Sequence, residues 1–509
     1  MEFTYKQKTK SIVRHKVLSK AVSLLTNQRY NACCVEKEYV RNLYDYFCNL
    51  DEEKDQLEAE QIEIDYIKEW ERIHTINLSQ KKVEELSVCY LAGPEPKNDF
   101  EELISLGILP NNIWAFESKN STYQTALNSI DSSNFKQPKL IKSSIEHFFE
   151  NTPKKFDIVY IDACCSLISD QHALKCIATL FKYHRLNSPG ILISNFAEID
   201  ATNPILKKEY LDIISRYFYI KRNNKFLLKE TNNRIEFYDD FYSFKNSIDE
   251  NFDDYYGNFI TEIICDTASI VIPTLRFMNS NFVNRVLKNK PQKTKGLTVD
   301  EVNSVHNNNL LKYISSNLLL EASNFDFSGI NRLKKLINEV SVNDTPIDLL
   351  SSLMELNYLR THEDGFKEDI KNAIFFFDDP KNMYQFLDKP DKILFLDSVI
   401  NQISYPMHYC SNKIERYSYI AKNTKMFTDL IVFDECRYIY DWLPAIDQIK
   451  NAFSNKSWQY TFRFALDGLV KQRINYNNEF FFKGSVINKN IKPFESKTIS
   501  KRIQIEERM

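Results

Sequence analysis

The chain has 509 residues, of which 43% are hydrophobic and 27% are charged, which is typical of a folded protein with room for about two to four domains. Glycine is scarce, with 9 residues, and the absence of a Gly-x-x-x-x-Gly-Lys-Ser/Thr run excludes a phosphate loop of that type. The ten cysteines form no Cys-x-x-Cys, which excludes the common zinc-ribbon spacings and favours reduced thiols in a cytoplasmic protein.

The formal net charge of −3 is unevenly distributed. Residues 1–35 hold seven Lys/Arg and one acid, and residues 456–509 hold eleven Lys/Arg and five acids, so each end carries a net charge of +6. Basic ends on an acidic body could bind nucleic acid or the acidic surface of a protein partner or another copy, or they could simply be solvated. The chain starts without an apolar signal region and has no run of 18 apolar residues, so we expect no membrane contact.

Residues 1–80 are predicted to form a helical region that caps the next domain. Residues 11–26 have helical apolar spacing, and Lys10, Arg14 and Lys16 lie mostly off the apolar face. Such a basic amphipathic helix either binds nucleic acid or a partner, or packs on the surface of its own domain.

Residues 81–240 are predicted to form an α/β domain. Four apolar runs without polar alternation indicate buried strands, and helix-length segments separate them, which implies parallel pairing. The helix predicted between the first two runs covers Asp99–Ile108. The four predicted strand runs are Ser87–Pro96, Asn112–Ser118, Phe156–Ser166 and Gly190–Glu198.

Polar residues fall at or just past the ends of these runs, where ligands bind in parallel sheets. Gly93 lies in the first strand-to-helix turn, where a ligand can approach the backbone. Glu117 follows it by 24 residues, at the end of the second strand, where a carboxylate can accept hydrogen bonds from ribose hydroxyls. Asp162 and Asn195 lie at the ends of the third and fourth strands. The spacing suits any ligand that contains adenosine.

The motifs LAGPEP, IWAFE, VYIDACCS and PGILISNF make Leu86–Glu230 resemble the class I S-adenosylmethionine-dependent methyltransferases, which have a Rossmann-like fold. The glycine turn departs from the family pattern, because Gly93 stands alone and Pro94 and Glu95 follow it. The resemblance implies S-adenosylmethionine as cofactor and Asp162 and Asn195 as catalytic residues. The cofactor-binding residues that it implies are Leu91, Ala92, Gly93, Pro94, Glu117, Ser144, Ile145 and Asp162.

Two methyltransferase subfamilies can be compared with this sequence. Asp162–Ser166 is similar to the Asp-Ala-Pro-Cys-Ser motif of RNA cytosine methyltransferases, but Phe196 stands where their attacking cysteine is expected. We therefore expect neither cysteine of the motif to be a nucleophile or to form a disulfide. Metal-dependent O-methyltransferases ligate magnesium with Asp, Asp and Asn, and here Ser194 replaces the middle acid, so no metal is expected.

Beyond Glu198 the pattern is less regular. The segment Tyr217–Glu230 could be a hairpin, which would match the antiparallel pair that ends the methyltransferase fold. A helical extension and linker is predicted over residues 241–290, with Lys288–Gly296 as the best linker candidate. Residues 291–509 are predicted to form a mainly helical C-terminal domain with an aromatic and basic end, typical of either a single-strand groove or buried aromatics with surface lysines.

The segment 405–444 holds the acids Asp429, Asp434, Glu435 and Asp441, which could bind a metal for hydrolysis. Arg437, three residues after Asp434, favours an internal ion pair instead. His408 could be a base or a structural residue.

The sequence leaves two functions open. The first is an S-adenosylmethionine-dependent methyltransferase that acts on nucleic acid or on a protein associated with it. The second is a catalytically degenerate Rossmann-like module that acts as a sensor or scaffold subunit in a larger assembly. Fold alone does not choose between them.

Overall fold

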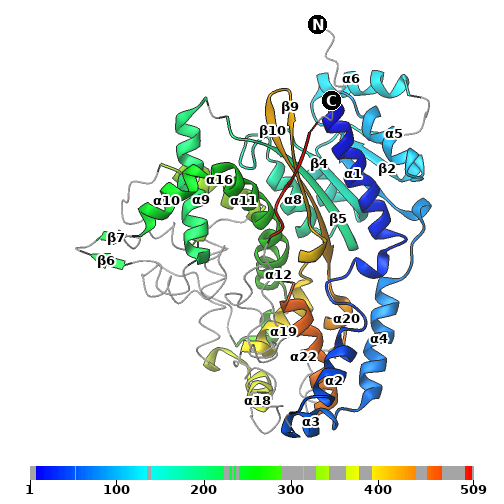
Figure 1. Ribbon diagram of the computed structural model, residues 1–509, viewed down its shortest axis with the longest axis vertical. Helices are drawn as coiled ribbons and strands as arrows, with labels where there is room; N and C mark the ends of the chain where they lie inside the picture. Colours follow the sequence, from blue (N-terminus) through cyan, green and yellow to red (C-terminus); the bar gives the residue numbers. More distant parts are fainter. Residues whose placement is uncertain are drawn as a thin grey trace.

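A computed structural model of the chain shows one large sheet with helices on both faces (Figure 1). The residues that it describes are 7–51, 53–133, 139–200, 202–222, 229–231, 234–236, 240–281, 283–288, 313–314, 328–342, 363–377, 393–442, 455–472 and 499–506.

Nine strands of the described residues form the main sheet, in the order β11-β9-β10-β5-β4-β1-β2-β3, with β8 paired to β10. The pairs from β5 to β3 are all parallel, so the predicted α/β, Rossmann-like class is confirmed. All four predicted strands are present as β1, β2, β4 and β5, and the short β3 is an addition. The strands are β1 Val88–Leu91, β2 Ile113–Phe116, β3 Lys139–Ile141, β4 Phe156–Asp162, β5 Leu186–Ala197, β8 His408–Tyr409, β9 Glu415–Ala421, β10 Thr424–Asp434 and β11 Ile503–Ile505.

The antiparallel pairs of the sheet all involve β10, which pairs with β5, β8 and β9, and the hairpin predicted at Tyr217–Glu230 is wrong in its first strand. Residues up to Arg222 continue a helix, α9 (Pro204–Arg222), and the next six residues lie outside the described part. Strands β6 (Lys229–Thr231) and β7 (Arg234–Glu236) pair only with each other. Strands β8, β9 and β10 lie in the range predicted as a mainly helical C-terminal domain. That range therefore shares its sheet with residues 81–240.

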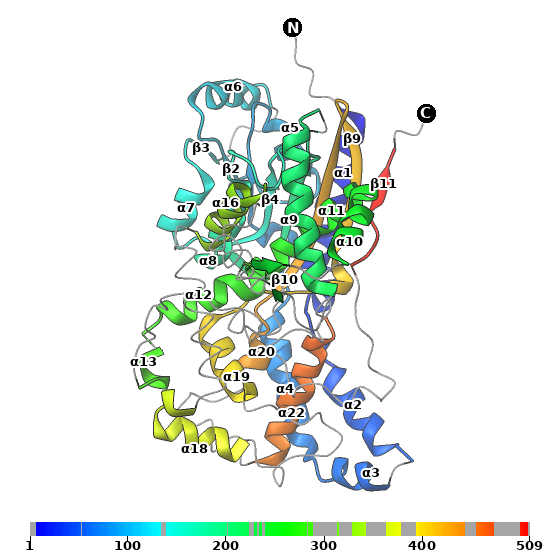
Figure 2. The same ribbon diagram turned by 90° about the vertical axis from the view of Figure 1, so that its left-hand side faces the viewer.

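Helices cover both faces of the sheet. Figures 1 and 2 show α1 on one side and α8, α11 and α16 on the other, and α1 contacts β5 and β9. The predicted helix after β1 is confirmed as α5. The helices bordering the sheet are α1 Lys8–Leu25, α5 Lys97–Ser105, α6 Asn120–Asp131, α7 Ile145–Asn151, α8 Ala173–Lys182, α10 Phe241–Glu250, α11 Phe252–Asp266, α12 Ile272–Asn279 and α16 Ile330–Ser341.

The remaining N-terminal helices pack away from the carboxyl ends of the parallel strands. Helices α2 and α4 contact α22, and α4 also contacts α20, at the lower end of the molecule in Figure 1. Of the N-terminal cap, α1 alone among the described helices lies along the sheet. The helices of this lower part are α2 Tyr39–Cys48, α3 Glu53–Ala59, α4 Ile64–Leu78, α13 Val283–Val286, α18 Glu368–Phe377, α19 Ile393–Ser404, α20 Arg437–Tyr440 and α22 Lys456–Val470.

Phe252–Asn279 is a long apolar helical segment that consists of α11, a π-helical stretch and α12. Among the described residues it is the one segment long and apolar enough to cross a membrane, and 94% of its most apolar window is buried inside the protein. Burial of that kind is typical of a core helix in a soluble protein. The cytoplasmic location stays a prediction.

Asp429 of β10 joins the C-terminal strand to the core. Its side chain is fully buried and lies 2.6 Å from the Arg502 guanidinium, 3.8 Å from Arg416 and 2.6 Å from the Thr261 hydroxyl that donates to it. The other acids of this segment are not a catalytic cluster: Arg437 pairs with Asp441 rather than with Asp434, which corrects the predicted ion pair. His408 is buried, and its Nε2 lies 2.7 Å from the Tyr440 hydroxyl.

Replacing Asp429 with Ala should lower the free energy of unfolding by about 3–5 kcal/mol, because two buried guanidiniums lose their anionic partner. Urea denaturation followed by circular dichroism measures the loss. The matched control is Asp253→Ala, which removes an exposed ion pair with Lys425 and should cost no more than about 1 kcal/mol. Equal losses in the two variants would contradict the assignment.

Candidate functional site

A cavity of about 650 Å³ opens where β1, β2, β3 and β4 end. The parallel strands bring these ends to one edge of the sheet, so segments distant in sequence line one space. Every residue that the sequence indicated for cofactor binding lies on its wall: Leu91, Ala92, Gly93, Pro94, Glu117, Ser144, Ile145 and Asp162. Asn195 does not line it but contacts Asp162.

The turn after β1 leaves its backbone open to the cavity. Gly93 has φ +57°, in the left-handed region, and a Cβ placed there would meet no atom within 4 Å. Glycine adopts this left-handed backbone conformation without strain, and its lack of a side chain leaves the space beside the backbone open. The turn is held by Tyr90, whose hydroxyl donates to the Pro96 carbonyl at 2.9 Å. Glu95, the acid that departs from the family pattern, lines the cavity and accepts a hydrogen bond from Asn98 at 3.0 Å.

The second and third strand ends provide a carboxylate and a helix start. Glu117 is half-buried, and its Oε1 accepts the backbone N–H of Lys119 at 2.7 Å, which holds the side chain at the cavity. Ser144 caps α7, and its hydroxyl accepts the backbone N–H of His147 at 3.2 Å. The cap places Ser144 and Ile145 together at the cavity wall.

A row of hydrogen bonds crosses three neighbouring strands at Asp162. The register sets Asp162 of β4 beside Asn195 of β5, and Asn195 beside Thr428 of β10. The Asn195 amide donates to Asp162 at 2.7 Å and to the Tyr419 hydroxyl at 3.1 Å, and the Thr428 hydroxyl donates to its oxygen at 2.7 Å. Asn195 is thus fully buried and fixed from both sides, and it orients Asp162.

Two cations of α1 enter the cavity, and sequence reasoning did not place them there. Lys10 lies 2.7 Å from Asp162, and Arg14 lies 2.6 Å from Asp99. Both line the cavity. The available signal was their spacing of four residues, which puts both side chains on one side of the helix. Lys16, in contrast, lies outside the cavity, 4.9 Å from the Tyr417 ring.

Burial and ion pairing oppose each other at these acids. Burial alone would raise the pKa of Asp162, but the charge of Lys10, with hydrogen bonds from Lys10, Asn195 and Cys164, holds that pKa below its usual value. At Asp99 burial dominates, and it raises the pKa despite the charge of Arg14. Ion pairing therefore outweighs burial at Asp162, whereas burial outweighs ion pairing at Asp99.

The two cysteines after Asp162 are free thiols, so the prediction that they form no disulfide is confirmed. Cys164 is exposed, and its thiol lies 3.1 Å from Asp162 Oδ1. Burial of the sulfur atom and the neighbouring carboxylate raise the pKa of Cys164 to about 12, so its thiolate is scarce at neutral pH. Cys165 is buried, and the Ser169 hydroxyl donates to it at 3.1 Å.

No protein-family model matches this chain, and no curated protein matches its sequence. Among solved structures it is similar to the crystal structure of an S-adenosylmethionine-dependent methyltransferase from Clostridium acetobutylicum ATCC 824, at 17% identity and a TM-score of 0.18. The match covers 31% of this chain and 58% of that one. A likeness this remote supports no conclusion about activity. The proposed function therefore rests on the geometry of the cavity.

Replacing Lys10 with Met should destabilise the protein by about 3 kcal/mol at pH 7, because Asp162 would be a buried charge without its partner. In the wild type the pKa of Asp162 is lower in the folded than in the unfolded state. The ion pair therefore stabilises the fold at pH values above the unfolded pKa, and this stabilisation disappears as the pH falls through the folded pKa. In the variant, burial raises the pKa of Asp162, so the deficit should shrink as the pH falls and the acid is protonated.

Thermal denaturation of both proteins from neutral to acidic pH measures this deficit. Lys16→Met is the control, because Lys16 lies on the same helix and points away from the cavity. A deficit that does not change with pH would show that Lys10 acts through packing rather than through the charge of Asp162.

Proposed function

We propose that this protein binds S-adenosylmethionine in the cavity at the strand ends and transfers its methyl group. The observation that carries the proposal is the convergence of an open left-handed Gly93, the Glu117 carboxylate and an ionised Asp162 around one space of about 650 Å³. Small-molecule sites in proteins have volumes of roughly 300–1,000 Å³, so this cavity is in the range for a nucleoside ligand.

The chemistry of the walls supports each part of that ligand. Glu117 offers a carboxylate to the two ribose hydroxyls, and Ser144 with Ile145 offers a polar and an apolar contact to the adenine edge. The backbone from Leu91 to Pro94 can approach the methionine part. That part carries an ammonium, a carboxylate and a sulfonium, and the cavity has both acids and cations to pair with them.

Asp162 would face the reacting carbon or orient the methyl acceptor, and Asn195 would hold Asp162 in place. Methyl transfer depends chiefly on in-line positioning of the acceptor and the sulfonium carbon, so few catalytic groups are required. The hydrogen-bonded row from Asp162 to Thr428 supports this role, because it fixes the carboxylate from a buried, rigid part of the sheet.

One observation favours a second candidate function, a sensor or scaffold that binds the cofactor without turnover. The Asp162 carboxylate already contacts Lys10, Asn195 and Cys164, so it has little capacity left for an acceptor unless Lys10 moves. A radiolabelled methyl-transfer assay separates the two: cofactor binding without transfer to protein or nucleic acid supports the sensor.

Nucleic acid, or a protein associated with it, is our proposed acceptor. The proposal rests on the net +6 at each end of the sequence and on the exposed Lys119 at the cavity. Part of that positive charge is engaged within the protein, since Lys10, Arg14, Lys471 and Arg502 form ion pairs. The remaining terminal lysines are therefore the ones to test.

Replacing Glu117 with Ala should weaken S-adenosylmethionine binding by about 10- to 150-fold, because charge-assisted hydrogen bonds to the ribose contribute about 1.5–3 kcal/mol. Isothermal titration calorimetry measures the affinity, with circular dichroism as the folding check. Glu101→Ala, an acid on the nearby α5 that does not line the cavity, is the matched control. Unchanged affinity in a folded Glu117→Ala protein would remove the ribose assignment.

Binding to single-stranded RNA should weaken steeply as salt rises, because each phosphate neutralised by the terminal lysines releases counterions. Fluorescence anisotropy over a salt series gives the slope. Reversing Lys489 and Lys492 to Glu should flatten it, whereas Lys68→Glu on α4, which reverses a charge outside the terminal segments, should not. No binding at low salt would contradict the nucleic-acid part of the proposal.

A further inference from the structure

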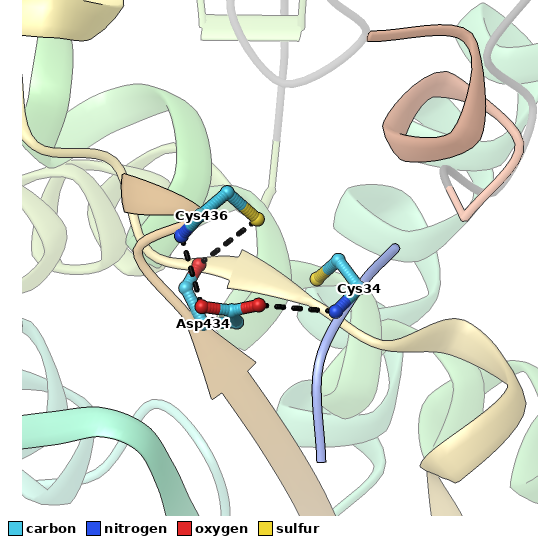
Figure 3. Close-up of side chains that lie close together, drawn as sticks. All are labelled: Cys34, Asp434 and Cys436. Carbon is cyan, nitrogen blue, oxygen red and sulfur yellow. Dashed lines mark hydrogen bonds between the residues drawn. The ribbon is translucent and has the colours of Figure 1, made fainter. Parts of the chain in front are cut away.

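Four potential metal ligands from three distant segments meet in the lower half of the molecule. Among the described residues, one atom each from Cys34, Asp434 and Cys436 lie within 4.8 Å of one another. Cys410 lies outside that group of three, but its sulfur is 3.3 Å from that of Cys34. Figure 3 shows the sulfurs of Cys34 and Cys436 pointing toward each other beside the Asp434 carboxylate. All four side chains are at most 2% exposed.

Asp434 is held by hydrogen bonds that also fix the two cysteines. Its Oδ2 accepts the backbone N–H of Cys34 at 3.1 Å and the Tyr438 hydroxyl at 2.7 Å. Its Oδ1 accepts the backbone N–H of Cys436 at 2.9 Å and the Ser188 hydroxyl at 3.0 Å. Carboxylates that bind metals are commonly oriented by such secondary hydrogen bonds. These four donors occupy both oxygens of the carboxylate, so a bound cation would replace one of the two hydroxyl donors, Tyr438 or Ser188.

The distances distinguish a metal site from a disulfide. Two sulfurs bound tetrahedrally to zinc at about 2.3 Å lie about 3.8 Å apart, whereas a disulfide requires about 2.05 Å. The separation of 3.3 Å between Cys34 and Cys410 needs only a small widening to admit a cation. Cys34, Cys436 and Asp434 supply three donors, and a shift of the Cys410 sulfur toward them would complete the four-coordinate, sulfur-rich set of structural zinc sites.

We propose that Cys34, Cys410, Cys436 and Asp434 form a structural site for a thiophilic divalent cation, zinc foremost. The thiols bind as thiolates, so each sulfur that ligates the cation gives up one proton to solvent and no electron is transferred. The sequence predicted no metal because the cysteines do not follow a zinc-binding spacing. Folding brings together Cys34 and two cysteines more than 370 residues away along the chain.

Nearby charge and space support the site. The buried Arg29 interacts electrostatically with Asp434 and offsets part of the negative charge of the donors. Asp434 also lines a cavity of about 260 Å³, which gives a cation a route to the cluster.

The site is separate from the cofactor cavity. Asp434 ends β10, whose antiparallel course places it near the start of β5, where Phe433 pairs with Gly190. The cofactor cavity lies at the opposite ends of the strands. A bound cation would therefore link the N-terminal segment to β8 and β10 without touching the proposed chemistry.

The test uses the full chain, produced with zinc and purified without chelator. Elemental analysis should find about one zinc per chain, and cobalt substituted for zinc should give the intense near-ultraviolet absorption of cobalt–thiolate bonds. Cys34→Ser and Cys436→Ser should each lower the bound metal at least tenfold. Cys89→Ser, which changes a fully buried thiol in β1, is the matched control and should keep the metal.

Three results would overturn the proposal. They are a wild-type chain that retains no zinc and shows no cobalt–thiolate absorption, full metal content in both folded cluster variants, or a Cys34–Cys410 disulfide found by mass spectrometry of the purified protein. The wild-type measurements decide the matter even if a serine variant fails to fold. Cofactor affinity should be unchanged in any folded cluster variant, so failure here is distinct from failure of the proposed methyl transfer.

Discussion

The pairing of β5 with β10 is the constraint on which the rest of the structure depends. The register sets Thr428 beside Asn195 and Asn195 beside Asp162, so one buried row of polar groups crosses three strands. Burying a polar group costs free energy unless the group has a hydrogen-bond partner. In this row Asn195 donates to Asp162 and accepts from Thr428. The position of Asp162 at the cavity therefore depends on Thr428 of β10, more than 260 residues later in the chain.

The N-terminal helix completes the cavity as well as covering the sheet. Helix α1 packs along β5 and β9 and places Lys10 beside Asp162 and Arg14 beside Asp99, where each cation opposes the effect of burial on the pKa of its acid. Ionised acids inside a low-dielectric site require such partners. The cavity wall carries six acids and three Lys/Arg, an excess of acids that suits the additional cation of the proposed ligand.

Strand β10 connects the two sites described above. Thr428, near its middle, supports the cofactor cavity through Asn195, and Asp434, at its end, supports the thiol cluster. The strand belongs to the C-terminal half of the sequence, and it pairs with β8 and β9 of the same half and with β5 of the N-terminal half. Long-range pairing of this kind makes the two halves of the chain one structural unit, although the sequence reads as a compact α/β domain followed by helices.

The sequence by itself determined the parallel part of the sheet and the edge at which Gly93, Glu117 and Asp162 meet. Both follow from local rules: apolar runs form buried strands, and the ends of parallel strands share one edge. Only the tertiary structure decided that β10 extends the sheet beyond β5, that Lys10 enters the cavity and that Cys34 meets Cys436. These contacts join residues about 150 to 400 positions apart, and no local periodicity or spacing records which distant partner a side chain acquires when the core is packed.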